Sequence, residues 1–320
     1  MNPLVSIALA TYNGQKFLEE QLDSIYNQTY KNIEVVVCDD KSDDLTVDIL
    51  KKYQKLYGLT YSINEVRLGV AKNFEKIVFY CKGKYILLSD QDDIWFPEKI
   101  ERLLYNIGTA SMIYSDGLIF HGDKSLSKEK LSNCTFIRLF GMDSSNEDFL
   151  KFAVLNSFIL GCSVMFDRII LKNAIPFYES NYNHDWWLVL CAQNENGVKY
   201  LNEVLFSYRI HDNNYSFREK NSIEKEGKRK NRMYKKLLSF NSPEKLYERY
   251  KKKLVIYHIA TRFKNGQHHQ FFSDLQAYSI SQKKILNIKD FLIVLKYRNF
   301  FFPNDSFLFR SYMVITSIFK

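Results

Sequence analysis

The chain has 320 residues, of which 46% are hydrophobic and 25% are charged, and its formal net charge is +9. This composition is typical of a folded globular protein and excludes a largely disordered chain. The length exceeds the usual size of one hydrophobic core and therefore predicts two structural units.

The first part of the chain alternates between short apolar runs and amphipathic segments. Apolar runs predict strands, and apolar residues at helical spacing predict helices. The predicted strands are 4–10, 33–40, 59–64, 84–90 and 111–120, and the predicted helices are 16–26, 41–53, 69–83 and 97–108. Because the strands are apolar along their length, we expect an α/β fold with a mostly parallel sheet and helices on both faces.

The rest of the chain is less regular. Residues 121–145 are polar and irregular in pattern. A strand followed by a helix is predicted over 157–171, a helix over 184–197, and one or two short strands over 198–214. From about Ser216 the pattern changes to basic helical segments.

Charge is distributed unevenly between the two parts. Residues 1–215 contain 22 basic and 28 acidic residues, whereas residues 216–320 contain 23 basic and 8 acidic residues. This asymmetry predicts an acidic unit followed by a basic one with a different partner.

The five cysteines are widely spaced and form no CxxC pair, so they predict neither a zinc site nor a disulfide framework. Cys38, Cys81, Cys162 and Cys191 lie in apolar surroundings and are expected to be reduced core residues. The sequence turns polar after ten residues, too early for a secretory leader. We therefore expect a cytosolic protein.

Polar residues directly follow three of the predicted strands. These sets are Thr11-Tyr12-Asn13, Asp39-Asp40 and Asp90-Gln91-Asp92. Ligands of open α/β sheets bind beyond the carboxyl ends of the strands, where the strand order reverses. The three sets therefore predict one ligand site at a single edge of the sheet.

The acidic set suits a metal-bridged phosphate ligand. Mg²⁺ and Mn²⁺ prefer oxygen ligands and often bind through one or two carboxylates and substrate phosphates. There is no GxGxxG or GxxxxGK[ST] sequence, so NAD-type and P-loop sites lack their phosphate cradle. The simpler alternative is a solvated acidic turn at the start of the helix over 97–108.

Several segments together resemble the family-2 inverting glycosyltransferases of the GT-A fold. They are "VSIALATYNGQKFLEEQLDSIYNQTYKNIEVVVCDDKSDD", "VRLGVAKNF", "LLSDQDDIWFPEKI", "ILGCSVMF", "HDWW" and "YRIHDNN". Within that family the chain resembles the bacterial rhamnosyltransferase-like branch of cell-surface polysaccharide synthesis. The resemblance implies a catalytic domain over 1–215, with a nucleotide-sugar half to about 120 and an acceptor half beyond it.

The resemblance also implies roles for individual residues. Those at the nucleotide sugar would be Thr11, Tyr12, Asp39, Lys72, Asp90, Gln91 and Asp92. Asp92 would bind Mg²⁺ or Mn²⁺, and His211 would complete the metal site. Asp185 would be the catalytic base, although the family more often has Glu-Asp where this chain has His184-Asp185.

Three positions are expected near the acceptor. Gly161 follows a predicted strand, which indicates close backbone approach to a neighbour or to the acceptor. Trp186 and Trp187 are expected to divide between the core and a platform for a sugar ring.

Simpler interpretations exist for four of these side chains. Asp185 suits the N-terminus of a helix, where the helix dipole favours an acid. His211 alone would be an ordinary polar contact, and Lys72 and Arg209 would be surface charges.

The resemblance implies transfer of a sugar from a nucleotide donor to a glycan or polyprenyl-diphosphate-linked acceptor. dTDP-L-rhamnose is the favoured donor, and a UDP-hexose is the alternative. Two other classes stay open, a nucleotidyltransferase and a non-catalytic nucleotide-sugar-binding protein. "TYNG" followed by acids argues against the first, which would require a glycine-rich basic loop.

The basic region over 216–320 has three possible interpretations. It combines basic clusters with apolar faces, as in "YKKKLVIYHIATRF" and "DFLIVLKYRNFFF", a pattern typical of helices on anionic membranes. No apolar run approaches the roughly 20 residues that span a bilayer. We therefore expect peripheral attachment to the inner face of the plasma membrane. A solvated helical bundle is the simpler alternative, and nucleic-acid binding lacks any recognition motif.

Overall fold

The structure is a computed structural model that describes residues 2–121, 125–130, 159–177, 184–211, 262–263, 270 and 272–274. The chain divides into two compact units, Met1–Arg209 and Ile210–Lys320. The predicted basic helical region over 216–320 lies outside the described residues except for 262–263, 270 and 272–274. In the described part of the chain, no helix has both the length and the apolar character that crossing a bilayer requires.

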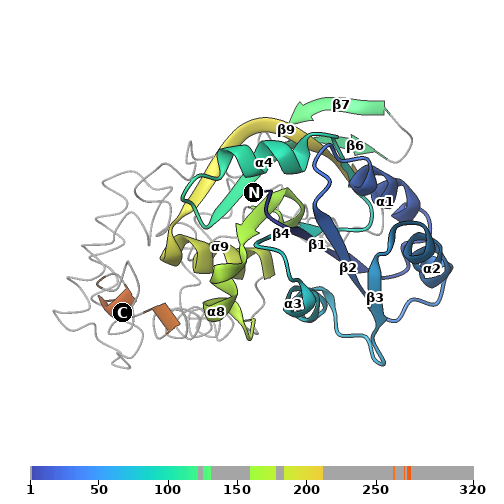
Figure 1. Cartoon of the computed structure of the whole chain (residues 1–320), viewed down its shortest axis with the longest axis horizontal. Coiled ribbons are helices and arrows are strands. Elements are labelled where there is room, and N and C mark those ends of the chain that lie inside the picture. The colour runs from blue at the N-terminus through green and yellow to red at the C-terminus, as the bar shows by residue number, and fades with distance from the viewer. Residues whose placement is uncertain are drawn as a thin grey trace, which may run out of the picture. The chain divides into compact units, whose positions relative to one another are not determined.

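The first four strands form the parallel half of one sheet (Figure 1). They are β1 (Val5–Thr11), β2 (Ile33–Asp39), β3 (Thr60–Ile63) and β4 (Tyr85–Ser89). β1 pairs in parallel with both β2 and β4, and β2 pairs in parallel with β3. The predicted parallel α/β arrangement is confirmed in this half.

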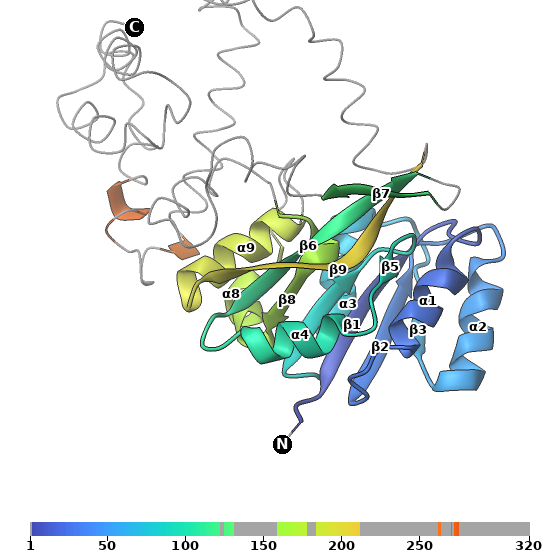
Figure 2. The ribbon, with the colours of Figure 1, turned by 90° about the horizontal axis from the view of Figure 1, so that it is seen from above.

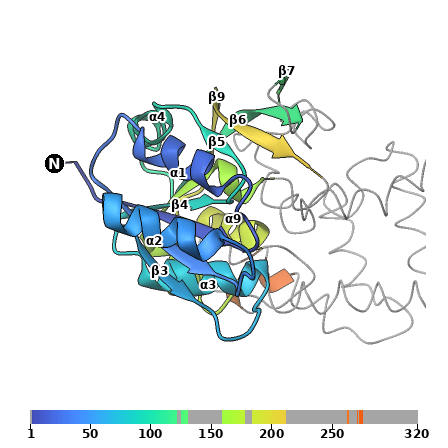
Figure 3. The same cartoon turned by 90° about the vertical axis from the view of Figure 1, so that its right-hand side faces the viewer.

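Helices cover both faces of these strands, as predicted. α1 (Leu18–Tyr26) and α2 (Thr46–Tyr57) pack together on one face, and α3 (Val70–Tyr80) packs on β1 and β2 from the other (Figure 3). The residues that recur at helical spacing are the buried ones, with Leu18, Leu22 and Ile25 on α1 and Phe74, Ile77 and Val78 on α3.

The later strands add an antiparallel half to the same sheet (Figure 2). The elements are β5 (Ile94–Trp95), α4 (Lys99–Asn106), β6 (Met112–His121), β7 (Ser125–Lys130), β8 (Val164–Asp167), α8 (Leu171–Ala174), α9 (His184–Glu195) and β9 (Val198–Ile210). The strand order is β3-β2-β1-β4-β8-β6-β9-β5, with β7 beside β6. β8 pairs antiparallel with both β4 and β6, so the parallel pattern ends at β4.

Three details of this half differ from the sequence-based expectation. β7 lies within 121–145, where the polar pattern indicated no strand. β5 has only two residues and is held by pairing with β9, so its own sequence carries no periodic signal. β9 is one strand of 13 residues, whereas one or two short strands were predicted.

The strand order reverses at β1, which lies between β2 and β4. The carboxyl ends of these three strands therefore meet at one edge, the usual ligand-binding position in open α/β sheets. The predicted reduced cysteines Cys38, Cys81, Cys162 and Cys191 are free and buried.

Candidate active site

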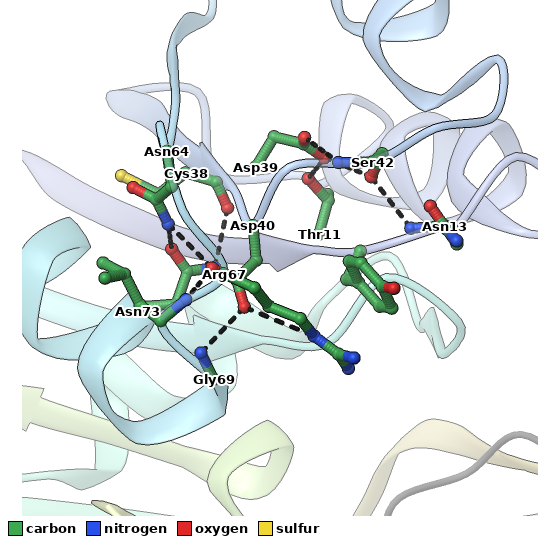
Figure 4. A network of polar contacts seen from close by, with 12 residues as sticks. Thr11, Asn13, Cys38, Asp39, Asp40, Ser42, Asn64, Arg67, Gly69 and Asn73 are labelled. Atoms are coloured by element: carbon green, nitrogen blue, oxygen red, sulfur yellow. Dashed lines mark hydrogen bonds and ion pairs between the residues drawn. The ribbon is translucent and has the colours of Figure 1, made fainter.

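Asp39 organises the carboxyl ends of β1 and β2. Its Oδ2 accepts hydrogen bonds from the hydroxyls of Thr11 (2.8 Å) and Ser42 (2.6 Å), and its Oδ1 accepts one from the Ser42 backbone N–H (2.8 Å) (Figure 4). Asp39 and Thr11 are both buried. The fold therefore holds this carboxylate in a fixed position beneath the strand ends.

The next residue, Asp40, fixes the loop that leads into α3. Its carboxylate accepts hydrogen bonds from the backbone N–H groups of Leu68 (2.7 Å) and Gly69 (2.8 Å) and from the Asn64 amide (3.0 Å) (Figure 4). The Arg67 guanidinium lies 3.8 Å from the ring centroid of Tyr12. A cation and an aromatic ring thus lie together beside the end of β1.

Gln91 joins the end of β1 to the acidic turn after β4. Its side-chain Oε1 accepts a hydrogen bond from the Tyr12 N–H (2.8 Å), and its Nε2 donates one to the Tyr12 carbonyl (2.9 Å). A Cβ at Gly14 would lie 2.3 Å from that Oε1, so glycine leaves the space that the amide occupies. The predicted nucleotide-sugar residue Gln91 thus uses its side chain to link two strand ends.

The acidic turn after β4 forms a buried cluster with Cys162. Ligand atoms of Asp90, Asp93 and Cys162 all lie within 4.8 Å of one another. Lys99 of α4 is fully buried and donates a hydrogen bond to the Cys162 carbonyl (2.6 Å). Its ammonium group also lies over the Trp95 ring, 4.1 Å from the centroid. A positive charge is therefore buried close to the acids.

Burial and mutual repulsion change the protonation of this cluster. Burial, together with the charges of Asp92 and Asp185, raises the pKa of Asp90 to about 7. Burial and the same kind of repulsion raise the pKa of Asp93 well above its usual range. Burial lowers the pKa of Lys99 to about 8, although the charges of Asp93 and Asp90 oppose this decrease. Lys99 therefore offsets only part of the cost of ionising these carboxylates.

Arg209 holds the backbone of the acidic turn in place. Its side chain is only 3% exposed; its Nε donates a hydrogen bond to the Asp92 carbonyl (2.8 Å), and Nη2 donates one to Glu20 (2.5 Å). Its backbone N–H donates to Asp93 Oδ1 (3.3 Å). The prediction that Arg209 is a surface charge is wrong, because β9 carries this side chain into the interior between Phe17 and Phe120.

The N-terminus of α9 brings Asp185 to the same site. The Asp185 charge is one cause of the raised pKa of Asp90, so the two carboxylates interact across the site. Asp185 is buried, and its Oδ1 accepts a hydrogen bond from the Trp186 N–H (2.7 Å). Gly161, in the short 3₁₀ turn Gly161–Ser163 before β8, lies against His184 and Asp185.

The remaining predicted residues lie in different surroundings. Trp186 and Trp187 are almost fully buried, and the Trp187 indole donates a hydrogen bond to the Ala174 carbonyl (2.8 Å), so both rings pack in the core. Lys72 of α3 forms an ion pair with Glu75 (3.3 Å). His211 directly follows β9 and is assigned to the second compact unit.

The acidic turn fits a divalent cation. Asp90, Asp92 and Asp93 supply carboxylate oxygens, the ligands that Mg²⁺ and Mn²⁺ prefer. The Asp93 Oδ2 atom is buried and has no hydrogen-bond partner within the described part of the chain. A buried, unpaired carboxylate oxygen is costly unless a further ligand binds nearby.

Sequence reasoning missed Lys99 and Arg209 as parts of this site. Lys99 is the first residue of α4, and a charged residue at this position is equally typical of an exposed helix end. Arg209 lies within the quoted "YRIHDNN" segment, and it alternates in phase with Glu203 and Ser207, so the local pattern gave no signal for its burial.

Comparison with known proteins identifies related sequences. The family described as "Glycosyl transferase family 2" matches residues 6–173. The chain is 28% identical over 327 residues to "Uncharacterized glycosyltransferase RT0329" of Rickettsia typhi, a match covering 100% of this chain and 95% of that protein. It is 30% identical over 211 residues to "UDP-Glc:alpha-D-GlcNAc-diphosphoundecaprenol beta-1,3-glucosyltransferase WfaP" of Escherichia coli, covering 65% and 78%. It is 29% identical over 228 residues to "dTDP-rhamnosyl transferase RfbG" of Shigella flexneri, covering 64% and 71%.

Two solved structures share the fold. S. aureus TarS 1–349 in complex with UDP-GlcNAc aligns with a TM-score of 0.57 at 16% identity, covering 92% of this chain and 81% of that one. The mannosyltransferase PcManGT from Pyrobaculum calidifontis, in complex with GDP-Man and Mn²⁺, aligns with a TM-score of 0.51 at 14% identity, covering 99% and 79%. The predicted fold class is confirmed by these similarities.

Proposed function

Because the chain belongs to glycosyltransferase family 2, we propose that it moves one sugar from a nucleotide-sugar donor to a glycan or polyprenyl-diphosphate-linked acceptor. The reaction belongs to bacterial cell-surface polysaccharide synthesis and proceeds with inversion at the anomeric carbon. Thr11, Tyr12, Asp39 and Lys72 contact the nucleotide, and Asp90 contacts the ribose or the transferred sugar.

The observation that carries the proposal is that Asp90 and Asp185 both lie at the turn Gly161–Ser163. Ligand atoms of Asp90 and Cys162 lie within 4.8 Å of each other, and a Cβ at Gly161 would lie 3.8 Å from Asp185 Cβ. Asp90 directly follows β4 and Asp185 belongs to α9, 95 positions later in the sequence, and the charge of Asp185 also raises the pKa of Asp90. In this proposal Asp90 holds the donor and Asp185 accepts the proton at the same site. This arrangement suits direct displacement, in which a single base is sufficient and no covalent nucleophile is required.

On the donor side, Asp92 of the acidic turn would hold Mg²⁺ or Mn²⁺. When bound, the cation offsets the negative charge that develops on the leaving diphosphate. Arg209 keeps the acidic turn in position by binding the Asp92 carbonyl. Lys99 reduces the repulsion between the buried carboxylates beneath it.

On the acceptor side, Asp185 takes the proton of the attacking hydroxyl. A hydroxyl group has a high pKa and is a weak nucleophile until a base removes its proton. The Trp186 N–H binds one oxygen of the carboxylate and so orients it. Gly161 leaves space beside the base for the acceptor to approach.

We favour dTDP-L-rhamnose as the donor, with a UDP-hexose as the alternative. The relative RfbG is named as a dTDP-rhamnosyl transferase and WfaP as a UDP-Glc-dependent glucosyltransferase, and these two similarities are nearly equal. A thermal-shift screen with and without Mn²⁺ tests the donor and the metal together. We expect one nucleotide sugar to raise Tm only with Mn²⁺, since a ligand that binds the native state stabilises it. If no nucleotide sugar raises Tm under either condition, the proposed function is wrong.

We further propose that the basic region over 216–320 attaches the enzyme to the inner face of the plasma membrane. Its excess of 23 basic over 8 acidic residues is attracted to anionic lipids, and no nucleic-acid partner is expected. The full-length protein should float with anionic vesicles, and raising the salt concentration should release it. Equal flotation with neutral vesicles would contradict an electrostatic attachment.

A further inference from the structure

His184 carries a buried nitrogen that makes no hydrogen bond. The residue is only 8% exposed, and its Nε2 has no partner within the part of the chain that the structure describes. An unpaired polar atom in the interior costs stability, and native proteins contain few of them. A carbon atom in place of Nε2 would remove this cost, so the presence of a nitrogen here requires a reason.

The ring of His184 is held in a fixed orientation. It stacks on Phe74 of α3, with ring centroids 4.3 Å apart and planes 21° apart. Burial lowers the pKa of His184 to about 3, so the imidazole is neutral at physiological pH. A neutral imidazole has one nitrogen that donates and one that accepts a hydrogen bond. The ring is therefore prepared to bind an uncharged polar group.

His184 and Asp185 border the same small space. A Cβ built on Gly161 would lie 3.1 Å from His184 Nε2, 3.5 Å from Leu88 Cδ1 and 3.8 Å from Asp185 Cβ. A side chain at position 161 would crowd His184 Nε2 and would contact Asp185 at an ordinary van der Waals distance. Glycine thus avoids a tight contact with the unpaired nitrogen, next to the proposed base.

We propose that His184 Nε2 forms a hydrogen bond with a sugar hydroxyl that lies beside Asp185 during the reaction. This inference rests on the proposed function, because it requires a sugar at the site. The hydroxyl belongs either to the acceptor or to the transferred sugar of the donor. His184 is then a substrate-binding residue that aligns the sugar with the base, and the loss of stability is the cost of that contact.

The test replaces the nitrogen by carbon while keeping the site filled. His184→Phe preserves the stacking on Phe74, and His184→Leu provides a smaller apolar side chain in case the larger ring does not fit. We expect at least one of these variants to be more stable than wild type, with an increase in Tm of about 2–4 °C. We also expect kcat/KM to fall about ten- to a hundredfold, as for the loss of one hydrogen bond. His184→Gln, whose amide can reach the position of Nε2, should restore part of the activity.

Tyr26→Phe is the matched control. The Tyr26 hydroxyl on α1 is also buried and without a hydrogen-bond partner in the described part of the chain, and its ring stacks on Tyr57 away from the site. This variant should gain similar stability and keep full activity. A stabilised His184 variant with unchanged kcat/KM would overturn the inference.

Separate kinetics for the two substrates identify which hydroxyl is bound. A higher KM for the acceptor alone, with donor hydrolysis unchanged, assigns the contact to the acceptor, whereas a higher KM for the donor assigns it to the transferred sugar. If wild-type protein turns over no nucleotide sugar, the proposed function fails. If wild type is active and equal to both apolar variants, only the role of His184 fails.

Discussion

Asp185→Asn is expected to reduce turnover by about 10²–10⁴-fold, the usual contribution of a positioned general base. The amide has the shape of the carboxylate and can still accept the hydrogen bond from the Trp186 N–H, so the N-terminus of α9 should keep its structure. An amide cannot take the proton of the attacking hydroxyl. The loss should therefore appear in kcat, with donor affinity nearly unchanged.

Initial-rate kinetics and donor titration separate these effects. Glu195→Gln, at the other end of the same helix, is the control, since its ion pair with Lys172 is exposed and such pairs contribute little. It should behave as wild type in both measurements. If Asp185→Asn turns over at the wild-type rate with an intact fold, Asp185 is not the base.

Asp92→Asn is expected to abolish the stabilisation that Mn²⁺ and donor produce together, and to lower activity about a hundredfold or more. Without metal, the same substitution should not lower the thermal stability of the protein. Asp92 raises the pKa of both Asp90 and Asp93, so its charge makes their ionisation more costly. Removing that charge should leave the metal-free protein as stable as wild type or more stable.

Thermal unfolding with and without Mn²⁺ and donor measures both the stability of the metal-free variant and its Mn²⁺-dependent shift in Tm. Asp43→Asn, which neutralises an exposed acid after β2, is the control and should change neither result. Persistence of the Mn²⁺-dependent shift in Asp92→Asn would remove Asp92 from the proposed metal site.

The strand ends could be predicted from the sequence, whereas the interior of the site could not. Thr11, Asp39 and Asp90 each follow an apolar run, and parallel strands bring such positions to one edge without further information. Lys99 and Arg209 become site residues only through contacts with distant segments. Arg209 reaches the acidic turn from 116 positions away through the pairing of β9 with β5, which no local pattern indicates.

Two further examples show why residue type alone misleads. Trp186 and Trp187 are typical of sugar-binding platforms, but α9 is buried around nearly all of its circumference. Gln91 lies between two candidate ligand-binding acids, yet its amide binds the backbone of Tyr12. In both cases packing against the rest of the chain decides the role of a side chain whose chemistry would suit a ligand.

Lys99 has a consequence for the protein without the proposed metal ion. Its buried ammonium group offsets part of the repulsion between Asp90 and Asp93. A divalent ion is therefore not the sole source of positive charge beside these acids. We therefore expect the chain to fold without the ion. Withdrawal of the ion by a chelator should silence such an enzyme reversibly and leave it folded.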